Sequence, residues 1–125
     1  MQAVKETAPP ELSLLIPLYN EEESLPFLLD RVREVMDGLG RPYEVVLVDD
    51  GSRDRTPELL RRAVAERPNL RVVLFRRNSG QTAALAAAIQ FSRGEILIPL
   101  DGDLQNDPAD IPKLLDRLAQ DFDVV

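Results

Sequence analysis

The fold of this chain is decided by the stretch Ile96-Leu97-Ile98-Pro99-Leu100-Asp101-Gly102-Asp103-Leu104-Gln105. Its apolar run is typical of a strand covered on both faces, and open α/β sheets bind ligands beyond the carboxyl ends of such strands. Because burying a bare carboxylate costs several kcal/mol, Asp101 and Asp103 must be solvated, paired or bound to a metal. Their hard oxygen atoms favour Mg²⁺ or Mn²⁺ holding a diphosphate. On this segment alone, a pair of solvated loop aspartates is an open alternative.

Outward from this stretch, apolar runs alternate with helical patterns along the chain. This alternation predicts a parallel sheet with right-handed crossovers. The expected strands are Leu12–Pro17, Val45–Val48, Leu70–Phe75 and the run from Ile96, and Asp123-Val124-Val125 resembles the start of a fifth. We therefore predict an α/β fold with three α/β/α layers. Its Rossmann-like sheet has four parallel strands in the order 3-2-1-4, plus an incomplete fifth strand.

The helices between these strands have their own markers. Helical spacing of Leu, Val and Met predicts a helix over residues 25–39, which Gly38 or Gly40 can end. Thr56 before Pro57 predicts the N-cap and first turn of a second helix. Alanine dominates residues 81–92, so this helix can approach the sheet closely. A last helix is expected near Asp110 and Ile111, with Pro112 in its first turn. The second helix is predicted to turn four residues inward: Leu59, Leu60, Ala63 and Val64.

Composition excludes several classes of protein. The 125 residues fit one domain, which we place at residues 12–125 after a flexible leader, residues 1–11. The absence of Cys and His removes disulfides, thiolate metal sites and Ser-His catalysis. Net charge is −7, yet the segment from Arg53 to Arg77 contains eight arginines and only three acidic residues. This basic segment suits phosphates, an anionic lipid surface or simple solvation, whereas overall acidity and few aromatic residues disfavour nucleic acid.

Three strand ends lead into acidic or polar loops, namely residues 17–21, 49–52 and 101–103. In a parallel sheet these loops open on one edge, and in the order 3-2-1-4 the loops after the first and fourth strands flank the switch point. No Gly-x-Gly-x-x-Gly and no Gly-Lys-Ser/Thr motif follows any strand. A nucleotide must then be held by carboxylates and a metal.

Four motifs together carry a resemblance to a known family. They are LIPLYNEEES (15–24), VVLVDDGSRDRT (45–56), RRNSGQTAALAAAI (76–89) and LDGDLQNDPADIP (100–112). In this order and spacing they resemble the nucleotide-binding half of inverting family-2 glycosyltransferases with the GT-A fold. The match covers residues 12–125, and Asp-x-Asp-Leu-Gln followed by Asn-Asp-Pro is most similar to the polyprenyl- and dolichyl-phosphate sugar transferases.

The resemblance implies a role for each matching residue. Pro17, Tyr19 and Glu21 would line the nucleotide pocket, with Asp49 or Asp50 toward the base or ribose. The divalent cation and the diphosphate would be held by Asp101, Asp103 and Gln105, and Asp103 would act in catalysis through the metal. Plainer interpretations remain: Tyr19 as an edge aromatic, Glu21–Glu23 as a solvated helix start. For residues 76–78, a phosphate or base contact is only one option.

The resemblance also implies the reaction and its partners. A sugar would pass from a UDP- or GDP-sugar to a polyprenyl (undecaprenyl or dolichyl) phosphate in one in-line displacement with inversion, assisted by Mg²⁺ or Mn²⁺. The acceptor phosphate is already an anion, so the lack of His is no obstacle. In this family the acceptor site lies largely beyond residue 125. The full-length enzyme would work in the cytoplasm at the inner face of the membrane, although no segment here is long enough to cross it.

Other classes fit less well. A receiver domain needs its phosphoacceptor Asp after the third strand, where Arg76 and Arg77 stand, and a haloacid-dehalogenase-like phosphatase needs Thr or Val where Leu104 and Gln105 stand. The serious alternative is a nucleotide-binding or assembly module without turnover, because the acceptor half is missing. The incomplete fifth strand also predicts a pairing edge that could drive formation of a homo-oligomer, and slow or no sugar transfer by the chain alone.

Overall fold

Four parallel strands form one sheet in the order β3-β2-β1-β4, as predicted. The computed structural model describes residues 9–100, 108–113 and 115–116. The strands are β1 (Leu12–Leu18), β2 (Tyr43–Asp49), β3 (Leu70–Leu74) and β4 (Ile96–Pro99), and the helices are α1 (Leu25–Leu39), α2 (Thr56–Glu66) and α3 (Gln81–Phe91). A short 3-10 turn, η1 (Pro108–Asp110), leads into helical residues 111–113 and 115–116. The predicted leader 1–11 is therefore described only from residue 9, and the expected fifth strand lies outside the described residues.

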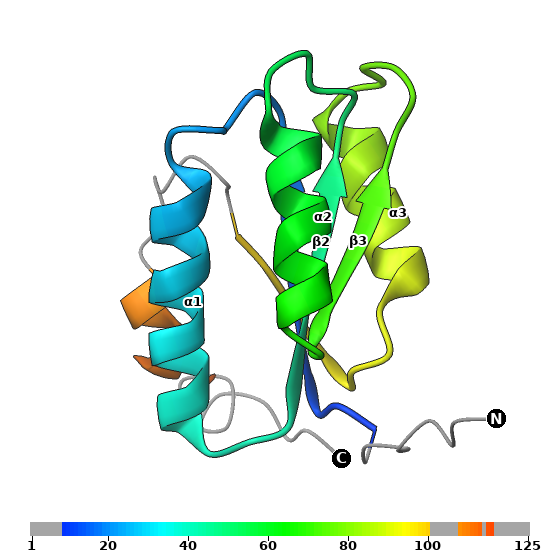
Figure 1. The fold of residues 1–125 in the computed structure, drawn as a ribbon. Coiled ribbons are helices and arrows are strands. Elements are labelled where there is room, and N and C mark those ends of the chain that lie inside the picture. Colours follow the sequence, from blue (N-terminus) through cyan, green and yellow to red (C-terminus); the bar gives the residue numbers. More distant parts are fainter. Residues whose placement is uncertain (1–8, 101–107, 114, 117–125) are drawn as a thin grey trace, which may run out of the picture.

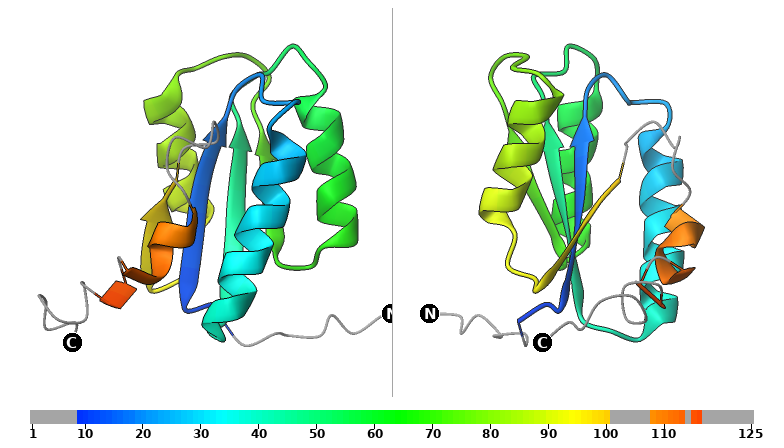
Figure 2. Two further views of the ribbon diagram at one scale, coloured as in Figure 1. Left: turned by 90° about the vertical axis from the view of Figure 1, so that its left-hand side faces the viewer. Right: turned by 180° about the vertical axis from the view of Figure 1, so that it is seen from behind.

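The elements stack in three layers, as Figures 1 and 2 show. α1, α2 and residues 108–113 and 115–116 cover one face of the sheet, and α3 covers the other. The larger core lies under α1 and α2, where Leu14, Ile16 and Leu47 are fully buried. The smaller core lies under α3, where Ala84 and Ala88 pack on Leu15 and Val46. These alanines bear out the prediction that small side chains would bring α3 close to the sheet.

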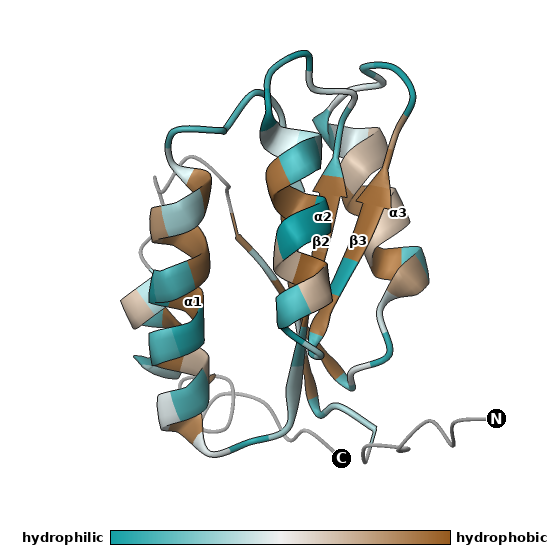
Figure 3. Ribbon diagram, viewed as in Figure 1, coloured by the Kyte–Doolittle hydropathy of each residue, from teal (hydrophilic) through white to brown (hydrophobic). Residues whose placement is uncertain are grey.

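Apolar side chains of β1 and β2 point to both faces of the sheet, because both faces of these central strands are covered. Figure 3 shows the same pattern: the strands are hydrophobic and α1 turns its apolar stripe toward the sheet, whereas the connections at the top of the view are hydrophilic. Polar residues therefore dominate the connections at this edge of the sheet.

β4 differs from its prediction, because it is covered on one face only. Ile98 is 2% exposed against the larger core, but Leu97, which points to the other face, is 38% exposed. The physical reason is that α3 packs mainly on β1 and β2 and leaves Leu97 of the edge strand β4 uncovered. An Ile- and Leu-rich run alone does not distinguish a central strand from such an edge strand.

Helix ends confirm some expectations and correct others. Gly40, with φ of +67°, caps α1 in the left-handed conformation, as expected of a stop glycine. Thr56 is the first residue of α2 rather than its N-cap; Arg55 occupies that position without a side-chain capping bond. Val64, predicted to face inward, is 38% exposed, whereas Leu60 and Ala63 are buried.

The final helical segment begins at Ile111 with Pro112 in its first turn, as predicted. No helix in residues 9–100, 108–113 and 115–116 combines the length and apolar character needed to cross a membrane.

Candidate functional site

The connections after β1, β2 and β3 meet at the carboxyl edge of the sheet, at the top of Figure 1. Hydrogen bonds tie the first two together across more than 30 residues of sequence. The Asn20 N–H donates to Ser52 Oγ at 2.8 Å, and the Arg53 N–H donates to Asn20 Oδ1 at 2.9 Å. Asn20 has φ of +52°, a left-handed conformation that Asn tolerates better than most residues. Two of the three loops predicted to converge are therefore side by side.

A second tie joins the β1–α1 loop to the start of α2. The Glu21 N–H donates to Thr56 Oγ1 at 2.9 Å, and the Glu22 N–H donates to Asp54 Oδ2 at 3.2 Å. The Thr56 hydroxyl in turn donates to Asp54 Oδ1 at 2.6 Å. Burial raises the pKa of Asp54, but the hydrogen bonds from Thr56 and Glu22 outweigh it and hold that pKa below its ordinary value.

Asp49 closes the turn that follows its own strand. Its carboxylate is 1% exposed and accepts the Ser52 N–H at 3.0 Å and the Ser52 hydroxyl at 2.5 Å. Because Ser52 Oγ also accepts the Asn20 N–H, Asp49 is linked to the β1–α1 loop through one hydroxyl. Its charge is satisfied inside the protein by local donors.

Asp50 holds the third connection, between β3 and α3. Its carboxylate is 4% exposed and accepts the Ser79 N–H at 2.7 Å, the Gly80 N–H at 3.0 Å and the Asn78 side-chain amide at 3.0 Å. Ser79 and Gly80 directly precede α3, so the negative charge lies at the positive end of a helix. The backbones also touch, since a Cβ added to Gly51 would lie 2.3 Å from the Arg77 carbonyl carbon.

The predicted site residues fall into two groups. Tyr19, Glu21, Asp49 and Asp50 lie together at this edge: Tyr19 is 42% exposed and Glu21 accepts the Ser24 hydroxyl at 2.9 Å. Pro17, half-buried in β1, lies two residues before the loop.

Asp101, Asp103 and Gln105 lie outside the described residues. Leu100, the last residue before them, donates its N–H to the Leu15 carbonyl at 2.9 Å and so continues the β4 pairing beside β1. Within the described part of the chain, no three acidic residues come together in a way that could hold a metal ion. The oxygen donors Asp, Asp and Gln suit a hard divalent cation by their chemistry.

Sequence reasoning missed the residues that tie the loops. Ser52, Asp54 and Thr56 follow β2 with a spacing of two, Ser-x-Asp-x-Thr, which is the signal that could have found them. Asn78 was considered as a ligand contact, and the structure shows it bound to Asp50. The exposed arginines Arg53, Arg76 and Arg77 stand on these same connections, so part of the basic segment lies at the site edge.

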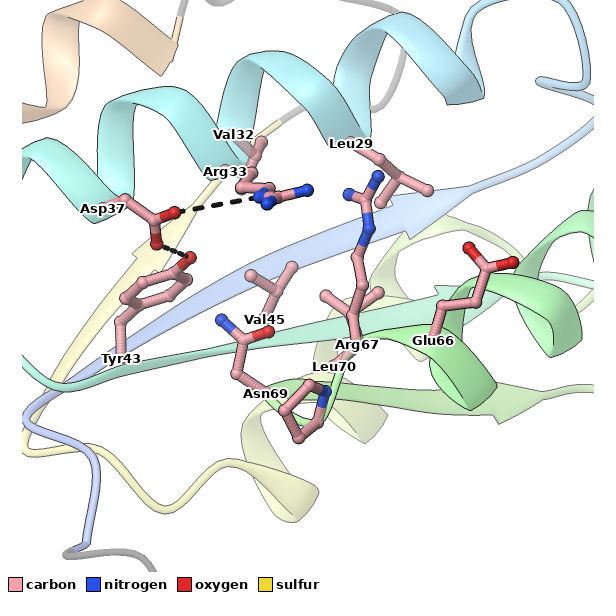
Figure 4. A pocket seen from close by; sticks show the side chains of 11 residues that line it. Leu29, Val32, Arg33, Asp37, Tyr43, Val45, Glu66, Arg67, Asn69 and Leu70 are labelled. Carbon is pink, nitrogen blue, oxygen red and sulfur yellow. Dashed lines mark hydrogen bonds and ion pairs between the residues drawn. The ribbon is translucent and has the colours of Figure 1, made fainter.

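A separate cavity of about 310 Å³ lies at the opposite end of the sheet. Figure 4 shows its polar side chains, which come from α1, β2, the end of α2 and the α2–β3 connection. Its two arginines are paired, Arg33 with Asp37 and Arg67 with Asp30. Burial and a hydrogen bond to Asp37 raise the pKa of Tyr43 to about 12, so this phenol stays protonated. The cavity does not touch the loops described above.

The parallel sheet of order 3-2-1-4, with tied polar connections at its carboxyl edge, is shared with solved glycosyltransferases of the GT-A fold. The chain belongs to glycosyl transferase family 2, whose family model matches residues 13–125.

A curated relative is the undecaprenyl-phosphate 4-deoxy-4-formamido-L-arabinose transferase of Pseudomonas aeruginosa PAO1. It is 54% identical over 116 residues, which cover 91% of this chain and 34% of the relative. The chain thus spans about a third of the length of the curated relatives it matches.

Two solved structures resemble the domain. A mannosyltransferase of Pyrobaculum calidifontis, in complex with GDP-Man and Mn²⁺, has a TM-score of 0.66 and 31% identity, over 78% of this chain and 30% of that one. Glucosyl-3-phosphoglycerate synthase of Mycobacterium tuberculosis, in complex with Mn²⁺, UDP and phosphoglyceric acid, also has a TM-score of 0.66. It shares 26% identity, over 87% of this chain and 39% of that one.

Proposed function

We propose that this chain binds a nucleotide diphosphate sugar at the carboxyl edge of its sheet. It would form the donor half of an inverting transferase that delivers the sugar to a polyprenyl phosphate. One observation carries the proposal: the loops that contain Tyr19, Glu21, Asp49 and Asp50 are fixed side by side in a chain 54% identical to an undecaprenyl-phosphate sugar transferase. The sugar in that relative's name, 4-deoxy-4-formamido-L-arabinose, is the first donor sugar to test.

Each part of the nucleotide has a proposed partner in the chain. Tyr19 and Glu21 stand at the open side of the edge, next to Pro17, and would line the pocket for the base and ribose. Asp49 and Asp50 are buried at the same edge, and one of them would face the base or ribose. UDP and GDP are both candidates, because solved relatives hold one or the other.

The diphosphate needs positive charge. We propose that Asp101, Asp103 and Gln105 hold Mg²⁺ or Mn²⁺ near it. A divalent cation there would offset the charge that develops on the departing nucleoside diphosphate. The residues of the chain would place the sugar's anomeric carbon in line with the acceptor phosphate, which is itself an anion near neutral pH and needs no histidine base. The acceptor site would lie largely outside this chain, and the whole enzyme would work at the inner face of the membrane.

Calorimetric titration of UDP- and GDP-sugars, with and without Mn²⁺, tests this assignment. We expect metal-dependent binding that Asp103→Ala weakens strongly, because a metal ligand is lost. Asp116→Ala is the matched control, since this exposed aspartate lies on the final helical segment. If the wild-type chain binds no nucleotide diphosphate sugar with Mn²⁺ present, the proposed site is wrong.

The alternative is a nucleotide-binding or assembly module without turnover. Transfer to undecaprenyl phosphate separates the two. We expect the 125-residue chain to bind the donor and to transfer its sugar slowly or not at all. Rapid transfer by the purified chain would place the acceptor site within these residues.

A further inference from the structure

Thr56 has a buried hydroxyl that does not cap its helix. The side chain is 0% exposed at the first position of α2, and its hydroxyl donates to Asp54 Oδ1 at 2.6 Å and accepts the Glu21 N–H at 2.9 Å. Asp54 accepts two further bonds, from the Thr56 N–H at 2.9 Å and the Glu22 N–H at 3.2 Å. The single Thr56 hydroxyl therefore accepts a bond from another segment of the chain and donates to Asp54, which holds the next residue of that segment.

The segment they hold is the β1–α1 loop, immediately after Tyr19. Glu21 and Glu22 donate consecutive backbone N–H groups to this pair, across 35 and 32 residues of sequence. Three successive glutamates, Glu21–Glu23, repel one another, and the chain turns through a left-handed residue at Asn20. Such a loop needs external contacts to keep a single shape.

We propose that Thr56 and Asp54 are positioning residues for the donor site. They hold the β1–α1 loop in the shape that presents Tyr19 and Glu21 to the nucleotide, and neither touches the nucleotide itself. This inference rests on the proposed function. Its physical basis is pre-organisation: a loop released from its anchors must be ordered again on binding, which weakens affinity without removing any contact to the ligand.

The chain offers a matched control in Ser13. Its hydroxyl is also 0% exposed, donates to a carboxylate, Glu44 Oε2, at 2.6 Å, and accepts one backbone N–H, from Gly94, at 2.8 Å. Ser13 lies on β1 near the opposite end of the sheet. Thr56→Val and Ser13→Ala therefore remove equivalent hydrogen bonds, one at the donor edge and one away from it.

The test compares Thr56→Val, Thr56→Ser and Ser13→Ala by three measurements: calorimetric Kd for UDP and for GDP with Mn²⁺, melting temperature, and amide hydrogen exchange of Glu21 and Glu22. We expect Thr56→Val to weaken nucleotide binding about tenfold or more and to speed Glu21 exchange. Ser13→Ala should lower the melting temperature at least as far and leave Kd within about twofold. Thr56→Ser, which keeps the hydroxyl, should behave like the wild type.

Two results overturn the inference. Faster Glu21 exchange with unchanged Kd would show that the anchor does not serve binding, and a weaker Kd with unchanged exchange would show that Thr56 contacts the nucleotide directly. Asp54→Asn repeats the comparison should Thr56→Val fail to fold. Absence of binding by the wild-type chain would instead count against the proposed function, while the exchange rates would still report on the loop anchor.

Discussion

Gly51 joins the two aspartates of the site to Ser52, and its replacement by alanine gives a sharp test of the site's packing. The residue has φ of +72°, and a Cβ there would lie 2.3 Å from the Arg77 carbonyl carbon and 2.4 Å from the Asn78 nitrogen. Both neighbours are backbone atoms, so no side chain can rotate away. The β3–α3 connection must move, and with it the amides that Asp50 accepts.

Two other glycines divide the expected cost into its parts. Gly40 has φ of +67° with nothing within 4 Å of an added Cβ, so Gly40→Ala carries strain alone, about 1 kcal/mol. Gly38 lies in α1 with open space and ordinary backbone angles, so Gly38→Ala should stabilise by roughly 0.5–1 kcal/mol. Gly51→Ala adds a clash with backbone atoms to the conformational strain, and we expect it to lower the free energy of unfolding by about 3 kcal/mol.

Thermal and urea unfolding followed by circular dichroism measures all three variants. At about 4 °C per kcal/mol for a domain of this size, Gly51→Ala should melt roughly 12 °C below the wild type, Gly40→Ala about 4 °C below and Gly38→Ala a few degrees above. Gly51→Ala should also weaken nucleotide binding, and Gly40→Ala should not. Equal melting temperatures for Gly51→Ala and Gly40→Ala would refute the close contact between the two connections.

Three further changes test other parts of the fold. The pKa of Asp54 is lowered from 3.8 in the folded protein, so the ionised carboxylate stabilises the fold. This contribution is complete above about pH 4 and is lost as the pH falls through the lowered pKa. In urea titrations, the difference in free energy of unfolding between wild type and Asp54→Asn should therefore shrink below pH 4. Glu44→Ala should lower the free energy of unfolding by about 3 kcal/mol in the same assay, because it leaves the buried Ser13 hydroxyl and the Arg93 N–H without their carboxylate acceptor. Leu97→Lys, on the exposed face of β4, should reduce self-association in sedimentation experiments at high protein concentration. A wild-type chain that stays strictly monomeric at that concentration would contradict the expected pairing edge.

The local sequence pattern predicts the fold correctly where a strand is buried on both faces of the sheet. β1 and β2 are buried on both faces and read as continuous apolar runs, and Gly40 marks the end of α1 where a left-handed residue is needed. The pattern was insufficient where tertiary context decides. Leu97 stands between two isoleucines in the sequence, as a residue of a central strand would. It is exposed because α3 packs on β1 and β2 and not over this residue.

The site was predictable as a set of loops, since the carboxyl ends of parallel strands share an edge, but not as a network. The sequence indicates that residues 19–21 and 49–52 are neighbours, yet it cannot tell which oxygen atoms face a ligand and which face the protein. Thr56 shows the difficulty: its position before a proline is typical of an N-cap, whereas its hydroxyl is bound by a backbone N–H from a loop 35 residues away. Long-range bonds of this kind have no local pattern.

The arrangement of Asp50 has a consequence for how the diphosphate can be bound. In many α/β folds the first amides of a helix at the carboxyl edge bind phosphate. In this domain the amides that precede α3 donate to the Asp50 carboxylate, so an internal anion already fills that position. The phosphates of the proposed donor would therefore need positive charge from elsewhere, and the chain has neither a Gly-x-Gly-x-x-Gly nor a Gly-Lys-Ser/Thr motif to supply a phosphate-binding loop. Arg53, Arg76 and Arg77 stand on connections at this edge and offer part of that charge. The divalent cation that we propose on Asp101 and Asp103 would offer the rest, so we expect nucleotide binding to depend on the metal.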